Sequence, residues 1–456
     1  MKNTISLRVA IATTIILFSC SKQEEFLSFK TNQSLAVPTT IMDYYALLKN
    51  EELFNKNESA MGTLTGDDDF YITTQTWLNA AIPTERNAYL WKEDIYENET
   101  FDFTSWTDGY ERVYVANVVL EGVESLNVTD VNLFNTVKGT ALFFRSLAFY
   151  NLIQIFCEPY DEQLGDNQMG IVLRLSSDIE RKEGRASLSQ SYAQVFKDLD
   201  EAIKLLPLVS EVPTQPSKLA VHALLARIYL SIHRFDEAYS HAVAAIEIGP
   251  EPTDFEPLSP TISVLSTTHL DECVFVTALK PLTFLSRRNQ VVKDELYQLY
   301  EDGDLRKSKY FNLENNVLRF RGTYDIRGQK FSGLAMGEIY LIAAECAARN
   351  GDTGIACNYL NKLLQKRYAK ESYVDFNNND QIEVLEKVLL ERRKELVLRG
   401  IRHSDLKRMN KYDGKRISVT REIDGVIYVL EPNSSRYVLP IPKIEVELND
   451  IKQNIR

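Results

Sequence analysis

The side chains that could do chemistry in this chain are aromatic and polar, and they lie in two irregular stretches. The first stretch, residues 62–100, holds the tryptophans Trp77 and Trp91 and the amide of Asn79. Proteins bind sugars with flat aromatic faces and nearby amide, carboxylate or guanidinium groups, which bond to the hydroxyls. A lone tryptophan is at least as often a core residue, so the sequence leaves both interpretations open.

The second stretch, residues 280–330, could form the opposite wall of such a site. It is weakly periodic and offers Phe284, Arg287, Tyr310 and Tyr324, which are singled out by location alone. The predicted ligand-binding residues are therefore Trp77, Asn79, Trp91, Arg287 and Tyr324.

Catalytic motifs are missing from the sequence. It contains no G-x-S-x-G, no H-E-x-x-H and no phosphate loop, and its five histidines do not cluster along the chain. We therefore predict no enzyme, cofactor or metal site, although a glycoside hydrolase needs only two carboxylates and the chain has 64 acidic residues. The run Asp67-Asp68-Asp69 lacks the further ligands of a calcium loop and is interpreted as a solvated turn.

The N-terminus predicts export and lipid attachment. Lys2 and Arg8 precede an apolar run, Val9–Phe18, which is too short to span a bilayer, and Ser19-Cys20 follows. Leu17-Phe18-Ser19-Cys20 resembles the bacterial lipobox, in which the cysteine thiol receives the lipid. We predict a lipoprotein signal peptide over 1–19, lipidation at Cys20 and a tether over 20–40.

The charge balance excludes nucleic acid as a partner. Loss of residues 1–19 removes Lys2 and Arg8 and no acid, so the net charge moves from −12 to −14. Binding to a polyanion needs a basic surface that releases counterions. The expected attachment to a membrane is through the N-terminal lipid.

The elements that must position these side chains are predicted to be helical repeats. Seven residues between 219 and 250 occupy the positions that a 34-residue tetratricopeptide repeat (TPR) prefers: Leu225, Ala226, Tyr229, Phe235, Ala238, Ala245 and Pro250. A weaker copy begins at Gly337, and a partial one ends at Pro207. We predict a mainly α, TPR-like scaffold with long irregular inserts and a few short strands, with repeat helices at about 131–156, 187–250 and 334–368 in one body, 41–456.

Shorter elements are predicted between and after the repeats. Alternation predicts a strand over 273–277, and 317–328 predicts a hairpin with turns at Gly322 and Gly328. Asp380 and Glu383 predict the start of a capped helix that ends at Gly400. The remaining cysteines are interpreted as buried thiols, with a Cys346–Cys357 bridge as the open alternative: Cys157, Cys273, Cys346 and Cys357.

Two blocks in the C-terminal part resemble the SusD/RagB family of surface nutrient-binding lipoproteins. The first is Glu391-Arg392-Arg393-Lys394-Glu395-Leu396 with Gly400-Ile401-Arg402 and Asp405-Leu406-Lys407-Arg408, and the second is the closing run from Leu439-Pro440-Ile441-Pro442 to Gln453-Asn454. The resemblance implies a non-catalytic protein that covers a SusC-like, TonB-dependent outer-membrane transporter. It also places a glycan-contacting loop near residues 62–100.

The resemblance identifies a fold more than a site. Arg392, Glu395, Arg402 and Asp405 are interpreted as a structural charge network and not as ligand contacts. The predicted function is capture of an oligosaccharide or polysaccharide at the outer face of the outer membrane. A peptide ligand remains an alternative, followed by a TPR scaffold for protein partners and a glycoside hydrolase.

Overall fold

The computed structural model describes residues 38–97, 105–258, 265–266, 272–322, 324–326 and 329–456. The predicted signal peptide, Cys20 and most of the predicted tether lie outside these residues, so lipidation stays a prediction. Among the described residues, no helix has both the length and the apolarity needed to cross a membrane.

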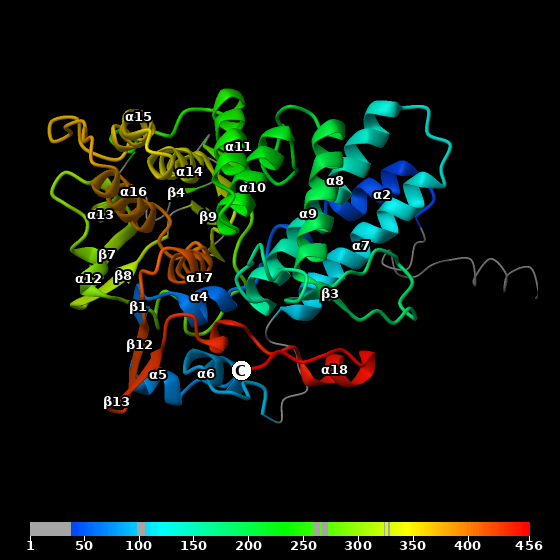
Figure 1. The fold of residues 1–456 in the computed structure, drawn as a ribbon, viewed down its shortest axis with the longest axis horizontal. Helices are drawn as coiled ribbons and strands as arrows, with labels where there is room; N and C mark the ends of the chain where they lie inside the picture. The colour runs from blue at the N-terminus through cyan, green and yellow to red at the C-terminus, as the bar shows by residue number, and fades with distance from the viewer. Residues whose placement is uncertain (1–37, 98–104, 259–264, 267–271, 323, 327–328) are drawn as a thin grey trace, which may run out of the picture.

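Three helical hairpins form the scaffold, as the repeat pattern predicts. Figure 1 shows them side by side across the upper part of the molecule. The pairs are α8 (Val131–Phe156) with α9 (Leu188–Leu205), α10 (Lys218–Ser231) with α11 (Phe235–Ile248), and α14 (Met336–Arg349) with α15 (Thr353–Leu364). The mainly α, TPR-like fold is confirmed.

Small residues set the close approach of these helices. Ala226, Ala238 and Ala245 are fully buried, as are Ala344 and Ala356 in the third pair. Because a methyl group fills little space, α10 and α11 can pack with their backbones close together, and each pair then covers the apolar face of the next. Helix α9 begins at a capping box formed by Ser187 and Gln190, as predicted.

Further helices extend the array at both ends. Helices α2 and α7 pack beside α8, and α16 packs against α14 (Figure 1). The remaining helices lie outside the array, and several of them belong to the lower layer, which is the part of the molecule drawn below the array in Figure 1. The bounds are α2 (Ile41–Leu48), α3 (Glu51–Phe54), α4 (Met61–Gly66), α5 (Thr74–Leu78), α6 (Pro83–Tyr89), α7 (Trp106–Glu124), α12 (Asp294–Tyr297), α13 (Leu305–Tyr310), α16 (Gln381–Glu395), α17 (Arg402–Tyr412) and α18 (Lys443–Asn449).

The strands form small separate sheets in the inserts. Four antiparallel pairs are β1 (Phe70–Tyr71) with β6 (Val291–Val292), β2 (Met169–Val172) with β3 (Arg185–Ser187), β5 (Cys273–Phe275) with β11 (Leu334–Ala335), and β12 (Val419–Ile423) with β13 (Val426–Leu430). Strand β9 (Tyr324–Ile326) lies between β4 (Leu265–Ser266) and β10 (Gln329–Lys330). The predicted strand at 273–277 is confirmed over its first three residues.

The predicted hairpin at 317–328 is displaced along the chain. The structure pairs β7 (Phe311–Glu314) with β8 (Val317–Phe320) around a two-residue turn at Asn315 and Asn316. Both asparagines have positive φ, 52° and 62°, the conformation that a tight hairpin turn requires and that asparagine tolerates. Glycine is therefore not needed at this turn, and prediction from Gly322 and Gly328 missed it.

Buried ion pairs tie the C-terminal helices to the scaffold. Arg367 is fully buried and its Nη2 lies 3.0 Å from Glu272 Oε2 and 2.8 Å from Glu395 Oε1. Arg392 Nε lies 2.9 Å from Asp405 Oδ2. Arg402 pairs in turn with Asp68, so Arg392, Glu395, Arg402 and Asp405 all lie in ion pairs within the fold, in agreement with their interpretation as a structural charge network.

Two smaller predictions have mixed outcomes. Helix α16 starts after Asp380, whose side chain accepts from the backbone N–H of Ile382 and Glu383, but it ends at Glu395 and not at Gly400. The thiols of Cys157, Cys273, Cys346 and Cys357 are buried and unbridged, which confirms the prediction of buried thiols.

Candidate ligand-binding cleft

A cleft of about 770 Å³ opens in the lower layer, beside the strand pair β1–β6 and the hairpin β12–β13. Its walls come from five separate parts of the chain, which meet at the left of Figure 1. The residues that line it are Asp68, Tyr71, Val291, Val292, Lys293, Asp294, Glu295, Leu296, Asn316, Val317, Leu318, Arg393, Ser418, Thr420, Arg421, Glu422 and Ile427. A volume of this size is typical of small-molecule sites.

Strand alternation places one aromatic ring in this cleft. In β1, Phe70 pairs with Val292 and is fully buried, whereas Tyr71 pairs with Val291 and is 42% exposed. Successive side chains of a strand point to opposite faces, so burial of Phe70 turns Tyr71 toward solvent. Tyr71 therefore presents an exposed aromatic face at the cleft, and the sequence analysis did not single it out.

The hairpin β12–β13 forms an apolar and polar wall. Val419, Arg421 and Ile423 face inward and are buried, so Thr420 and Glu422 face outward. Ile427, which pairs with Glu422, is 67% exposed. With Asp294, Glu295 and Asn316, which are also exposed, the cleft combines apolar surface with carboxylate, amide and hydroxyl groups.

A buried arginine supports the floor of the cleft. The Arg421 guanidinium donates to the backbone oxygens of Phe70, at 2.9 Å, and Asp67, at 2.8 Å. It also lies over the rings of Tyr89 and Trp91, at 4.6 and 5.6 Å from their centroids. Cation–π contacts of this kind hold β12 against the segment that carries Tyr71.

Trp91 belongs to this support and not to the binding surface. Its side chain is 1% exposed, and its Nε1 donates to the backbone oxygen of Thr65 at 2.7 Å. The ring therefore presents no face to a ligand. The prediction of Trp91 as a ligand-binding residue is wrong, because the indole packs in the interior with Leu406, Met409 and Val419.

Trp77 and Asn79 lie at the surface next to the hairpin. Both belong to the α5 segment, which is fixed to the hairpin turn because Asp424 N donates to Thr74 Oγ1 at 2.9 Å. The Trp77 ring is half-buried and its Nε1 donates to Arg86 O at 3.2 Å, whereas Asn79 is exposed and its Oδ1 accepts from Gln75 Nε2 at 2.9 Å. Neither lines the cleft, but both remain available to a ligand that extends beyond it.

Arg287 lies at a second, smaller cleft of about 300 Å³. Its side chain is 42% exposed and forms an ion pair with Glu314. Lys280, Phe320, Arg321 and Lys330 also line this second cleft. The hairpin β7–β8 separates the two clefts, since Val317 and Leu318 line the larger and Phe320 lines the smaller.

Tyr324 is a core residue. Its side chain is 1% exposed, and its hydroxyl donates to Glu272 Oε1 at 2.6 Å. Phe284 and Tyr310, the other candidates for the second wall, are also fully buried. The prediction of Tyr324 as a ligand contact is wrong, because its ring packs against Phe331 and the Arg399 guanidinium in the interior.

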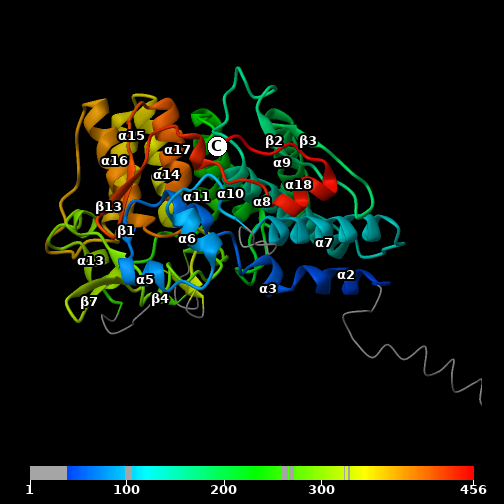
Figure 2. The same cartoon turned by 90° about the horizontal axis from the view of Figure 1, so that it is seen from below.

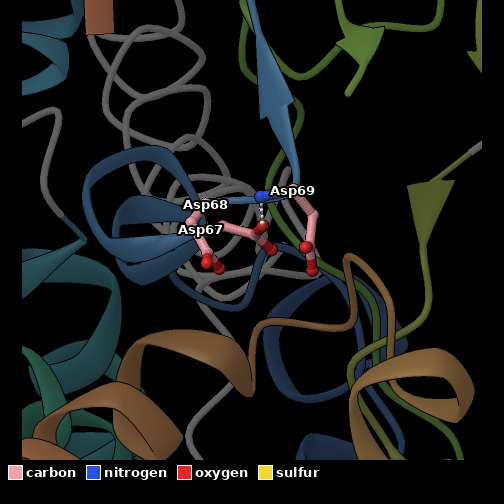
Figure 3. Close-up of side chains that lie close together, drawn as sticks. All are labelled: Asp67, Asp68 and Asp69. Atoms are coloured by element: carbon pink, nitrogen blue, oxygen red, sulfur yellow. Dashed lines mark hydrogen bonds between the residues drawn. The ribbon is translucent and has the colours of Figure 1, made fainter. Parts of the chain in front are cut away.

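The three aspartates at the edge of the cleft do not form the solvated turn that the sequence predicted, because Asp67 and Asp69 are buried and Asp68 is half-buried. Figure 3 shows their carboxylates turned to the same side, and oxygens of all three lie within 4.8 Å of one another. Asp68 accepts from Arg402 Nε at 2.7 Å, and Asp69 accepts from Arg393 Nε at 2.8 Å. These guanidinium groups supply the positive charge that a bound cation would otherwise provide.

The environment sets the protonation of these carboxyl groups. Burial, together with the neighbouring Asp69 and Asp68, raises the pKa of Asp67 to about 8. Burial would also raise the pKa of Asp68, but the Arg402 guanidinium outweighs it and the pKa falls below its ordinary value. The cluster therefore holds a neutral Asp67 at pH 7 next to an ionised Asp68.

Fold and site together define a helical-repeat binding protein whose cleft is mounted on irregular inserts. Two family models match the chain: one described as "Starch-binding associating with outer membrane" over residues 23–230, and one described as "SusD family" over residues 321–455. The chain belongs to the SusD/RagB family.

Solved structures agree with this assignment. A putative sugar-binding protein from Bacteroides vulgatus ATCC 8482 has a TM-score of 0.72 at 22% identity, covering 92% of this chain and 99% of that one. A SusD superfamily protein from Bacteroides thetaiotaomicron VPI-5482 has a TM-score of 0.73 at 21% identity, with 92% and 100% covered. Surface glycan-binding protein A from Bacteroides uniformis has a TM-score of 0.69 at 18% identity, with 91% and 99% covered. At such identities the likeness is one of fold, and no curated protein matches the chain.

Proposed function

We propose that this protein is a surface lipoprotein that binds an oligosaccharide or polysaccharide and delivers it to a SusC-like, TonB-dependent transporter in the outer membrane. Binding is passive, with no bond made or broken in the ligand. The observation that supports this most directly is the exposed ring of Tyr71 on a cleft of about 770 Å³ rimmed by carboxylate, amide and hydroxyl groups. The family model described as starch-binding supports a glycan as the ligand class.

In this proposal Tyr71 is the platform and the exposed polar side chains hold the hydroxyls. A sugar ring stacked on Tyr71 would lie near Glu422 and Thr420 of the hairpin and near Asn316 of the β7–β8 turn. Trp77 and Asn79 would contact the next units of the chain. Arg287 would contact only a longer glycan that reaches the smaller cleft.

A matched pair of tyrosine variants tests the site. Tyr71 is 42% exposed on the cleft, and Tyr114 is 44% exposed on α7, away from it. We expect Tyr71→Ala to weaken glycan binding about tenfold, near 1.4 kcal/mol, in calorimetric titrations with a ligand selected on a glycan array. Tyr114→Ala should bind like the wild type, and both variants should keep the wild-type melting temperature. Equal affinities for all three proteins would refute the placement of the site.

The delivery role has a separate test. Cys20→Ala should abolish metabolic labelling of the protein with palmitate and release it from the outer membrane, because one acyl-modified cysteine is the proposed anchor. The lipidated wild type should co-purify from outer membranes with a barrel transporter. Retention of a glycan by a protein that never associates with such a barrel would support binding alone and refute delivery.

A further inference from the structure

The central repeat hairpin carries a pair of histidines that ligand binding does not use. His222 lies on α10 and His241 on α11, and their Nδ1 atoms are 2.9 Å apart. Both rings are half-buried, so they are fixed by packing and still reach solvent. Neither residue lines either of the clefts described above.

Packing holds both imidazoles in place. The ring of Tyr229 stacks on His241 with a centroid distance of 5.5 Å and an interplanar angle of 7°, and Phe196 stacks on Tyr229 at 4.5 Å. The two imidazole centroids are 5.2 Å apart. Two nitrogen ligands on adjacent rigid helices are therefore preorganised, which reduces the entropy lost when both bind one ion.

We propose that His222 and His241 form a two-nitrogen site for a late first-row transition-metal ion of the Cu²⁺ or Ni²⁺ class. With metal–nitrogen bonds of about 2.0–2.1 Å, a separation of 2.9 Å gives a nitrogen–metal–nitrogen angle of about 90°. That angle fits adjacent positions of a square-planar or tetragonal ion better than the tetrahedral positions of Zn²⁺.

The protonation states of the pair suit this role. Burial lowers the pKa of His222, and so does Lys218, while burial and His222 lower the pKa of His241 to about 4. Both rings are neutral at pH 7, and one Nδ1–H donates to the other Nδ1. On metal binding the donating ring changes tautomer, its proton moving from Nδ1 to Nε2 through solvent, so that both Nδ1 lone pairs face the ion.

Water completes the coordination shell in this proposal. Within the described residues, the acidic turn at Asp67–Asp69 is the only group of three or more potential ligand side chains, so the histidine pair has no third protein ligand of that kind. Lys218, one helical turn before His222 on α10, acts electrostatically on that ring, and its charge opposes a bound cation. Removal of that charge should therefore tighten binding.

Copper titration of the full mature chain, without a histidine tag, tests the proposal. We expect one Cu²⁺ per chain in calorimetry at pH 7 and a tetragonal electron paramagnetic resonance signal with coupling to two nitrogens. His222→Gln and His241→Gln should each weaken binding at least about tenfold and remove the two-nitrogen signal. Lys218→Gln should tighten binding.

His233→Asn is the matched control. His233 has a positive φ of 68°, which asparagine tolerates, and it lies beside Asp413 and not beside another histidine. This variant should bind Cu²⁺ like the wild type. The proposal is overturned if the wild type binds no Cu²⁺ above competing glycine buffer, or if the His222→Gln/His241→Gln double variant retains both the stoichiometry and the two-nitrogen signal. Circular dichroism of each variant separates loss of a ligand from loss of the fold.

Discussion

The repeat array and the candidate cleft are built from the same chain by different means. Each hairpin of the array uses two helices close together in sequence, such as α10 and α11, and buries small residues between them. The cleft instead collects Tyr71, Lys293, Asn316, Arg393 and Ile427 from five distant segments. The array is thus defined by local periodicity, whereas the cleft exists only once the array has brought its inserts together.

The two regions also use charge differently. Next to the array, Arg367 lies between Glu272 and Glu395, and both carboxylates are buried with it. At the cleft, the carboxylates of Glu422 and Asp294 remain exposed. Paired charges fix a structure, whereas exposed ones can exchange water for ligand hydroxyls.

The largest expected effect concerns Trp91, which supports the cleft from below. Trp91→Ala should lower the free energy of unfolding by about 3–5 kcal/mol, because it removes a buried indole and leaves a cavity under Arg421. Urea denaturation measures this. Trp77→Ala, which removes a half-buried ring at the surface, is the control and should lower the free energy of unfolding by clearly less. Equal losses would show that Trp77 is as much a core residue as Trp91.

The contrast between these tryptophans shows which features of the site cannot be predicted from the sequence. Both lie in the same irregular stretch, and nothing in residue type or spacing separates them. The difference depends on Arg421, more than 300 residues away, which lies over the Trp91 ring. Tyr71 was missed for the same reason: a two-residue strand is too short to show alternation before its partner Val291 is known.

The helices could be predicted because each depends on its own residues. The helix Val131–Phe156 could be predicted from its richness in Leu, Phe and Ala, and the alanines of the repeat predict the hairpin at 219–250. The hairpin at Asn315-Asn316 differs from the prediction because its turn uses two asparagines in the left-handed region, where the prediction relied on glycine. Local signals thus give the scaffold, and contacts distant in sequence give the site.

A second prediction breaks the packing of the array. Ala238 is fully buried where α11 meets α10. Ala238→Leu should lower the free energy of unfolding by about 1–3 kcal/mol, because the larger side chain forces the two helices apart. Ala193→Leu, on the exposed side of α9, is the control and should change it by less than about 0.5 kcal/mol. Glycan affinity should stay unchanged while the protein remains folded, since the cleft does not include α11.

A third prediction concerns the neutral Asp67. Its pKa is raised to about 8 in the folded state, against about 3.9 in the unfolded chain, so the folded state binds more protons between these values. Its contribution to stability is present in full below pH 4 and declines as the pH rises to 8, by at most about 1.4 kcal/mol per pH unit. Asp67→Asn removes this titration.

Urea denaturation at pH 4, 6, 8 and 9 measures the difference between wild type and Asp67→Asn. The variant should become progressively more stable than the wild type from pH 4 to 8, and the difference should then level off. Stability curves that stay parallel from pH 4 to 9 would show that the pKa of Asp67 has its ordinary value. The Arg402 guanidinium would then stabilise the Asp67 carboxylate as it stabilises that of Asp68.

The smallest expected effect separates the two clefts. Arg287 and Glu314 form an exposed ion pair, which is typically worth about 0–1 kcal/mol, so Arg287→Ala should leave the melting temperature nearly unchanged. Affinity for a short oligosaccharide should also stay at the wild-type value, because Arg287 lines the smaller cleft on the other side of the β7–β8 hairpin. Affinity for a polysaccharide should fall by up to about 1 kcal/mol if the chain crosses that hairpin. Calorimetry with both ligands decides: a loss with the short ligand would mean that the two clefts form one site, and no loss with either would confine the ligand to the cleft at Tyr71.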